Sequence, residues 1–226
     1  VDLYNDSMQT DIASVYNKVS FYKEEALAFY RNFTRTVISS NTDPAKKEAF
    51  LKSLQKAAQQ DKLTILADMN GSARTVSIDK DFFTSLGFGF ISFNDTPRDI
   101  VHAIIPEPEN LVHCARKMEE LQSQGDTSVV LGYMPDCDGD RGNIVYWNDK
   151  EKKAEVLMAQ EVFALSVLSE LSFTAYNNNA QTPEELRKLK TAVSVNDPTS
   201  MRIEEIAQAF CASVYRAEVG EANVVN

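Results

Sequence analysis

The chain has 226 residues, of which 43% are hydrophobic and 25% charged, which is ordinary for a globular protein with a sizeable core. Its net charge of −10 argues against a nucleic-acid surface, which needs clustered lysine and arginine. Cys114, Cys137 and Cys211 form no CxxC pair, and no apolar run approaches the ~18 residues of a membrane span. We therefore expect a cytoplasmic protein with reduced thiols that binds neither nucleic acid nor membrane.

Helix and strand signals alternate along the first part of the chain. Apolar residues recur at helical spacing from Phe21 to Ser40, which predicts an amphipathic helix whose aromatic side chains lie in the core. Pro44 suits the first turn of a second helix. Three further elements are predicted after it: a buried strand at 63–67, a helix at 78–86 and a strand at 88–93.

The next elements complete a sheet and then reverse its direction. Prolines and acids at 106–110 precede a helical apolar run that ends at Leu121, and residues 128–133 are apolar on both faces, as in a central parallel strand. Only residues 134–142 separate this strand from the next, at 143–147. A parallel crossover needs about a dozen residues, so the fourth strand must return antiparallel.

Signals for a second α/β unit follow, with helices at 156–171 and 201–210 and strands at 192–195 and 213–217. We expect an α/β fold of two units, with mixed, mainly parallel sheets covered by helices and the last strand of the first sheet antiparallel. The expected domains are residues 1–149 and 150–226. The chain begins without methionine and ends on an apolar run, which favours a piece of a longer protein.

Asp136, Asp138 and Asp140 alternate along the loop between the third and fourth strands, which places their carboxylates on one side of an extended segment. Clustered hard oxygen ligands suit Mg²⁺ or Ca²⁺. An EF-hand is excluded, because its sixth position needs glycine and its twelfth needs glutamate, where this chain has Arg141 and Trp147. A solvated acidic loop is the alternative.

The segment Pro135-Asp136-Cys137-Asp138-Gly139-Asp140-Arg141 resembles the Asp-Gly-Asp-Gly-Asp-Arg metal loop of the α-D-phosphohexomutases, the phosphoglucomutase and phosphomannomutase superfamily. Other segments are similar to parts of that family's second and third domains: Asp68–Gly71, Leu86–Phe93, Pro108–Leu111, Gln160–Leu171 and Arg216–Val224. The resemblance implies a fragment that covers the second domain and most of the third.

The resemblance also implies which residues bind the metal and the phosphate. Asp136, Asp138 and Asp140 would bind Mg²⁺ as the cofactor, and Arg141 would contact a phosphate or phosphoserine. The parent protein would be a hexose-phosphate mutase that moves a phosphoryl group between the sugar 1- and 6-positions through a phosphoserine. That serine loop and the sugar-reading loop match nothing in this chain, and Ala222 stands at a family lysine position. We therefore expect this piece alone to be inactive.

Two alternatives stay open. In an aspartyl-phosphate phosphatase the first aspartate of a DxD motif attacks phosphate, and Asp136-Cys137-Asp138 permits this. In a scaffold module a cation merely tightens the loop.

The remaining polar residues receive structural interpretations. We interpret Arg74 as a surface residue at a helix start, with a position facing the ligand cleft as the alternative, and His102 and His113 as surface or partly buried polar residues. Neighbouring carboxylates would raise the pKa of Cys137, which argues against a nucleophilic role. Trp147 is expected to pack on the returning strand.

Overall fold

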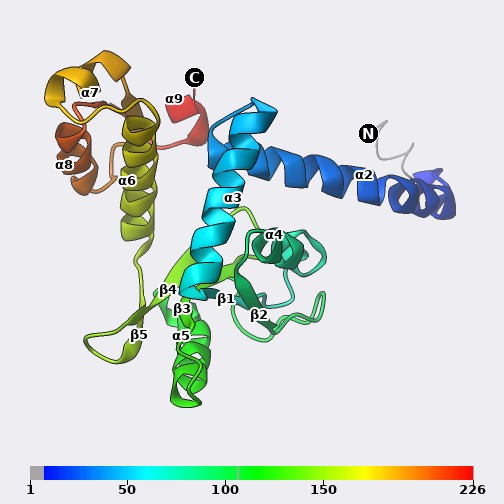
Figure 1. Ribbon diagram of the computed structural model, residues 1–226. Helices are drawn as coiled ribbons and strands as arrows, with labels where there is room; N and C mark the ends of the chain where they lie inside the picture. Colours follow the sequence, from blue (N-terminus) through cyan, green and yellow to red (C-terminus); the bar gives the residue numbers. More distant parts are fainter. Residues whose placement is uncertain (1–7, 106, 226) are drawn as a thin grey trace.

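The computed structural model describes residues 8–105 and 107–225, without the side chain of Glu221. It contains a five-stranded mixed sheet and a two-stranded parallel sheet, each with helices packed on it (Figure 1). The predicted α/β fold with mainly parallel sheets is confirmed. Within the described residues, none of the helices combines the length and apolar character needed to cross a bilayer.

Two helices precede the first sheet: α2 (Ile12–Ser39) and α3 (Pro44–Asp61). Both begin at an aspartate whose side chain accepts backbone N–H groups of the first turn, Asp11 for α2 and Asp43 for α3. Pro44 occupies the first turn of α3, as predicted. In Figure 1 the blue helix α2 extends away from the rest of the chain.

The prediction that the aromatic residues of this first helix lie in the core is wrong. Phe21, Phe29 and Phe33 are 78%, 70% and 62% exposed. Only part of α2 is held, through Leu27 and Ile38, which pack against a cluster contributed by α3 and the segment around α4. Helical spacing identified the helix, but it carries no information on whether a partner covers the apolar face.

The first sheet has the strand order β2-β1-β3-β4-β5. Its strands are β1 (Thr64–Asp68), β2 (Gly89–Phe93), β3 (Val129–Pro135), β4 (Gly142–Asn148) and β5 (Lys153–Val156). Strand β1 pairs parallel with β2 and β3, whereas β4 pairs antiparallel with β3. The predicted reversal of the fourth strand is confirmed, and Pro135 faces Gly142 across the bend.

Helix α5 (Pro108–Ser123) covers the first sheet and builds its core. The short elements η1 (Ala73–Val76) and α4 (Asp79–Ser85) connect β1 to β2. Seven fully buried residues form the central cluster, and they come from β1, α5, β3 and β4: Leu66, Leu111, Cys114, Met118, Val129, Met134 and Val145. Trp147 packs against this cluster, as predicted. The cluster fixes the position at which β3 ends and the acidic loop begins.

The remaining chain forms a smaller unit around strands β6 (Ala192–Asn196) and β7 (Ser213–Ala217). Its helices are α6 (Ala159–Asn177), α7 (Pro183–Leu189), α8 (Arg202–Ala209) and α9 (Glu221–Val225). A separate cluster centred on Val195 and Ile203 holds it together. Strand β5 pairs with β4, so the first sheet continues through Val156. The division after residue 149 falls in that hairpin and stays a prediction.

Candidate metal centre

The loop between β3 and β4 brings three carboxylates together. One oxygen from each of Asp136, Asp138 and Asp140 lies within 4.8 Å of the other two. The Asp136 backbone N–H donates to the Arg141 carbonyl at 3.0 Å, which closes the loop at its base. Asp136 is 2% exposed, whereas Asp138 and Asp140 are exposed to solvent. The sequence prediction therefore placed the three aspartates together correctly, while their role as ligands stays a prediction.

Asp136 anchors the loop through both of its carboxylate oxygens. Oδ1 accepts the backbone N–H groups of Gly139 at 3.1 Å and Arg141 at 3.2 Å, and Oδ2 accepts Nε of Arg141 at 2.8 Å. Burial opposes ionisation, but the hydrogen bonds and charge of Arg141 outweigh it and lower the pKa of Asp136. The same hydrogen bond raises the pKa of Arg141, whose side chain is 65% exposed.

The other two aspartates repel each other. The charge of Asp138 is the largest cause of a raised pKa at Asp140, followed by burial and the charge of Asp136. The nearest ion pair that relieves this charge is Arg141 with Asp140, at 3.8 Å. Three carboxylates thus converge with one guanidinium between them, which leaves an excess of negative charge at the loop.

The donor set fits a hard divalent cation. Carboxylate oxygens are the ligands that Mg²⁺ and Ca²⁺ prefer. Ligands on opposite sides of Ca²⁺ lie ~4.8 Å apart, and those on opposite sides of Mg²⁺ ~4.2 Å. The observed limit of 4.8 Å between the three oxygens is therefore compatible with either ion after a small contraction. Exposed Asp138 and Asp140 are free to make that movement, and buried Asp136 supplies the fixed ligand.

The segment that follows β1 supports the loop. The Ala73 N–H donates to the Cys137 carbonyl at 2.8 Å. Gly139 has φ of +79°, and a Cβ added there would lie 2.5 Å from Cδ of Arg74. Glycine is needed at this position both for the left-handed backbone and for the close approach of Arg74.

Arg74 lies at the start of the short helix η1, as interpreted from the sequence, but it is partly buried rather than free on the surface. Its side chain is 25% exposed and lies against the acidic loop, paired with Asp79 of α4 at 2.6 Å between Nη2 and Oδ1. Nη1 also donates to the Tyr30 hydroxyl of α2 at 2.7 Å. Burial lowers the pKa of Arg74, but the hydrogen bonds and charges of Asp79 and Tyr30 outweigh it and raise the pKa overall.

Asp79 and Tyr133 were not predicted from the sequence to lie near the site. The Tyr133 hydroxyl donates to Asp79 Oδ2 at 2.6 Å, and burial followed by the Asp79 charge raises the pKa of that phenol. Asp79 is 3% exposed, so Tyr133 and Arg74 supply the polar contacts that offset its burial. No motif joins residues this far apart in sequence, and only the packing of α4 on the sheet brings them together.

A second polar network fixes the loop after β2. Asp68, which is fully buried, pairs with Nε2 of His102 at 2.9 Å and accepts a hydrogen bond from Asn94 at 2.9 Å. The His102 side chain is 6% exposed and stacks on His113 with ring centroids 4.2 Å apart. His102 as a whole residue is partly buried, as interpreted from the sequence, while its side chain is almost fully enclosed. For His113, burial and the neighbouring His102 lower the pKa.

Two of the hollows on the first unit lie at opposite ends of β3 and β4. One of about 840 Å³ adjoins the acidic loop and is lined by Gly71, Ser72, Ala73, Thr75, Val76, Pro97, Arg98, Ile100 and Cys137. Ser72 is 4% exposed there, and its Oγ has no hydrogen-bond partner among the described residues.

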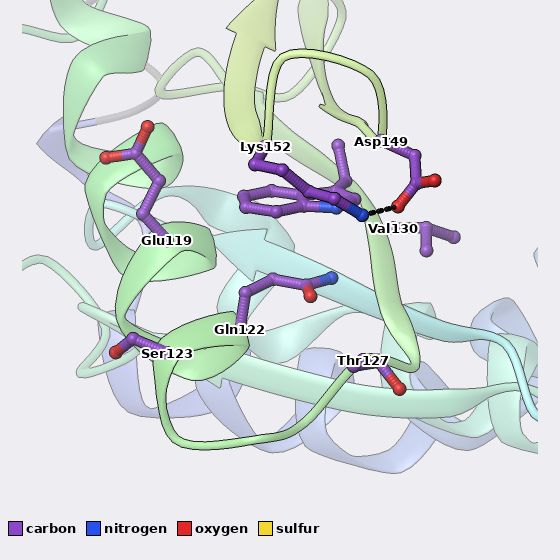
Figure 2. A pocket seen from close by; sticks show the side chains of 8 residues that line it. Glu119, Gln122, Ser123, Thr127, Val130, Asp149 and Lys152 are labelled. Atoms are coloured by element: carbon purple, nitrogen blue, oxygen red, sulfur yellow. Dashed lines mark hydrogen bonds and ion pairs between the residues drawn. The ribbon is translucent and has the colours of Figure 1, made fainter.

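The other hollow, of about 800 Å³, lies at the opposite end of β3 and β4 (Figure 2). Its Lys152 pairs with Asp149 at 2.7 Å, and Gln122 donates to the Val129 carbonyl. Because these groups are paired locally and lie at the far end of the strands, the hollow is not part of the metal centre.

Similarity to known proteins is confined to structure, since no family model and no curated protein matches the sequence. A phosphoglucomutase/phosphomannomutase family protein from Burkholderia thailandensis superposes with a TM-score of 0.54 at 15% identity, over 77% of this chain and 34% of that one. A putative phosphomannomutase from Thermus thermophilus gives a TM-score of 0.49 at 18% identity, over 76% and 36% of the two chains.

The fold is therefore similar to that of an α/β region within a solved phosphoglucomutase/phosphomannomutase family protein, and the resemblance predicted from the sequence is confirmed at the level of the fold. The chain spans about a third of the length of the solved structures it matches, 34% in the Burkholderia protein. An N-acetylglucosamine-phosphate mutase of the α-D-phosphohexomutase superfamily is also similar, with a TM-score of 0.46 at 14% identity, over 77% and 38% of the chains.

Proposed function

We propose that this chain is the metal-loop region of a Mg²⁺-dependent hexose-phosphate mutase, with Asp136, Asp138 and Asp140 as the Mg²⁺ ligands. The observation that carries the proposal is the convergence of three carboxylate oxygens within 4.8 Å at the end of β3. The fold shared with a solved phosphoglucomutase/phosphomannomutase family protein supports it. We further propose two domains, at 1–149 and 150–226, and a cytoplasmic location.

Each loop residue has a distinct part in the proposed chemistry. When bound, Mg²⁺ supplies positive charge that screens a phosphate and stabilises the charge that develops as a phosphoryl group moves. Hydrogen bonds from Gly139 and Arg141 fix the carboxylate of Asp136, so this residue would be the ligand whose position does not change on binding. Arg141 holds Asp136 through Nε, and its exposed guanidinium is placed to donate hydrogen bonds to phosphate oxygens.

The phosphoryl carrier belongs to another part of the longer protein. Arg141 and the three aspartates position and stabilise a phosphoryl group without carrying it. Ser72 is a nearby serine, but it is 4% exposed, so its hydroxyl is closed to a sugar phosphate. We infer that the phosphoserine and the hexose-phosphate contacts lie outside this chain. An aspartyl-phosphate phosphatase stays the alternative enzyme class, and a covalent phosphate trapped on Asp136 would favour it.

Thermal unfolding with and without Mg²⁺ tests the proposed cation site. Mg²⁺ at 100 times its dissociation constant should add about 2.7 kcal/mol to the free energy of unfolding. Asp138→Asn, which removes one exposed carboxylate, should abolish most of that gain. An equal gain in the wild type and in Asp138→Asn would refute the assignment of the ligands.

A further inference from the structure

We propose that Arg74 is a positioning residue for the acidic loop. It contacts the loop from the side of η1 and α2 and thereby sets the position of Asp138 relative to a bound cation. The inference rests on the proposed function, because cation binding at the loop is what Arg74 would tune. It goes beyond that function, since Arg74 is not among the carboxylate ligands.

The first step is the contact between Arg74 and Gly139. Cδ and Cγ of Arg74 would lie 2.5 and 2.7 Å from a Cβ at Gly139, so the alkyl stem of the arginine packs directly on the loop backbone. A glycine with φ of +79° allows this approach. The alkyl stem therefore limits how closely the loop backbone can approach η1.

The second step is the neighbouring hydrogen bond from Ala73 to Cys137. The Ala73 N–H donates to the Cys137 carbonyl at 2.8 Å. Residues 73 and 74 thus hold the loop at residues 137 and 139, on both sides of Asp138. The carboxylate of Asp138 is exposed, whereas the contacts of residues 137 and 139 fix its backbone. Any displacement of Arg74 consequently moves Asp138 relative to Asp136.

The third step is the anchoring of Arg74 itself. Its guanidinium makes two contacts with Asp79, Nε to Oδ2 at 3.1 Å and Nη2 to Oδ1 at 2.6 Å. Nη1 donates to the Tyr30 hydroxyl at 2.7 Å, and Cζ lies 5.8 Å from the centre of the Tyr30 ring. The Arg74 charge is therefore neutralised by Asp79, so its effect on the loop is mainly mechanical.

This arrangement links helix α2 to the cation site. Tyr30 of α2 accepts a hydrogen bond from Arg74, and the alkyl stem of Arg74 lies against Gly139. A shift of α2 is transmitted to the loop through two side chains. Residues that orient metal ligands typically change metal affinity by about 10- to 100-fold when they are replaced.

The test is calorimetric titration of the chain with Mg²⁺ alone, at a temperature at which each variant is shown by circular dichroism to be folded. Arg74→Met keeps the alkyl stem but removes its anchors, and we expect at least about a tenfold loss of affinity. Tyr30→Phe, which removes one hydrogen bond, should give a smaller loss. Arg74→Met also leaves Asp79 unpaired, so Arg74→Met/Asp79→Asn provides a variant without an orphan buried charge.

One further test variant, Gly139→Ala, and two controls, Arg31→Met and Gly125→Ala, separate positioning from general loss of stability. Arg31→Met removes the exposed 3.8 Å ion pair with Asp81 of α4 and should leave the affinity unchanged. Gly139→Ala and Gly125→Ala place alanine at φ of +79° and +92°, but only the first brings its Cβ against Arg74, because a Cβ added at Gly125 has no non-neighbouring atom within 4 Å. Gly139→Ala should lose affinity and Gly125→Ala should not.

The possible outcomes are distinct. Unchanged Mg²⁺ affinity in both Arg74→Met and Arg74→Met/Asp79→Asn, with normal wild-type binding, overturns the inference and leaves the proposed cation site intact. Equal affinity losses in Gly139→Ala and Gly125→Ala overturn it as well. Absence of Mg²⁺ binding by the wild type overturns the proposed cation site, and this inference with it.

Discussion

Nε of Arg141 lies 2.8 Å from Oδ2 of Asp136, so the residue that ends the acidic loop neutralises the buried residue that begins it. Backbone N–H groups of Gly139 and Arg141 occupy the other oxygen of Asp136. These hydrogen bonds fix Asp136 at the base of the loop, and Asp138 and Asp140 remain exposed beside it.

Replacement of Arg141 by glutamine should strengthen Mg²⁺ binding severalfold. The substitution removes a positive charge that repels the cation, while the backbone N–H groups still fix Asp136. Calorimetric titration at two salt concentrations checks this, because the gain should shrink as salt screens the charge. Weaker Mg²⁺ binding by Arg141→Gln would mean that Arg141 mainly holds the loop together.

Glu155 should contribute to the acid sensitivity of the β4–β5 hairpin. Hydrogen bonds from Tyr146, Asn148 and Lys153 lower its pKa to about 2. A carboxyl with a lowered folded-state pKa stabilises the fold above its unfolded pKa, and that stability is lost as pH falls toward the folded pKa.

Urea unfolding across the range from about pH 5 to about pH 2 measures this contribution. The wild type should lose more stability over that range than Glu155→Gln, which has no carboxyl to protonate. Glu151→Gln, an exposed acid in the same hairpin, is the matched control and should behave like the wild type. Identical slopes for Glu155→Gln and the wild type would contradict the hydrogen-bonded role of Glu155.

His102→Ala should destabilise the first unit by about 1–3 kcal/mol, because it leaves a buried oxygen of Asp68 without its hydrogen-bond partner. Asp68 is fully buried, and the His102 side chain is 6% exposed. Urea unfolding gives the free-energy change. His113→Ala removes only the stacked ring and is expected to cost less. Equal costs for the two variants would show that ring stacking, rather than the hydrogen bond to Asp68, sets the stability.

This chain alone should not convert hexose 1-phosphates to 6-phosphates. Neither Mg²⁺ nor Arg141 carries a phosphoryl group, and Ser72 is buried. The assay compares the purified chain with a longer protein that adds a phosphorylated serine loop. Turnover by this chain alone, unchanged in Asp136→Asn, would show that the proposed chemistry is wrong.

Much of the first sheet could be predicted because local signals and chain length constrain it. The connection between β3 and β4 is too short for a parallel crossover, so the reversal followed from length alone. Alternation of Asp136, Asp138 and Asp140 at the end of a buried strand placed the three carboxylates together. Strand β5 was missed, because its four residues, KAEV, carry too little apolar pattern to identify an edge strand.

The contacts that could not be predicted from the sequence join residues far apart in the chain. Arg74 meets Tyr30 and His102 meets Asp68 only through the packing of separate elements. Phe29 has the spacing of a core residue, yet it is 70% exposed, because an apolar helix face does not reveal whether anything covers it. The support of the acidic loop by residues 73 and 74 likewise leaves no motif in the sequence.

The most direct test of the central claim is to locate a bound cation in crystals. Mn²⁺ replaces Mg²⁺ at oxygen sites and gives an anomalous signal, so crystals soaked in Mn²⁺ should show a peak among the carboxylates of Asp136, Asp138 and Asp140. The metal–oxygen distances should be about 2.0–2.4 Å. The peak should be lost in Asp138→Asn. A peak elsewhere on the chain, with none at the acidic loop, would contradict the assignment.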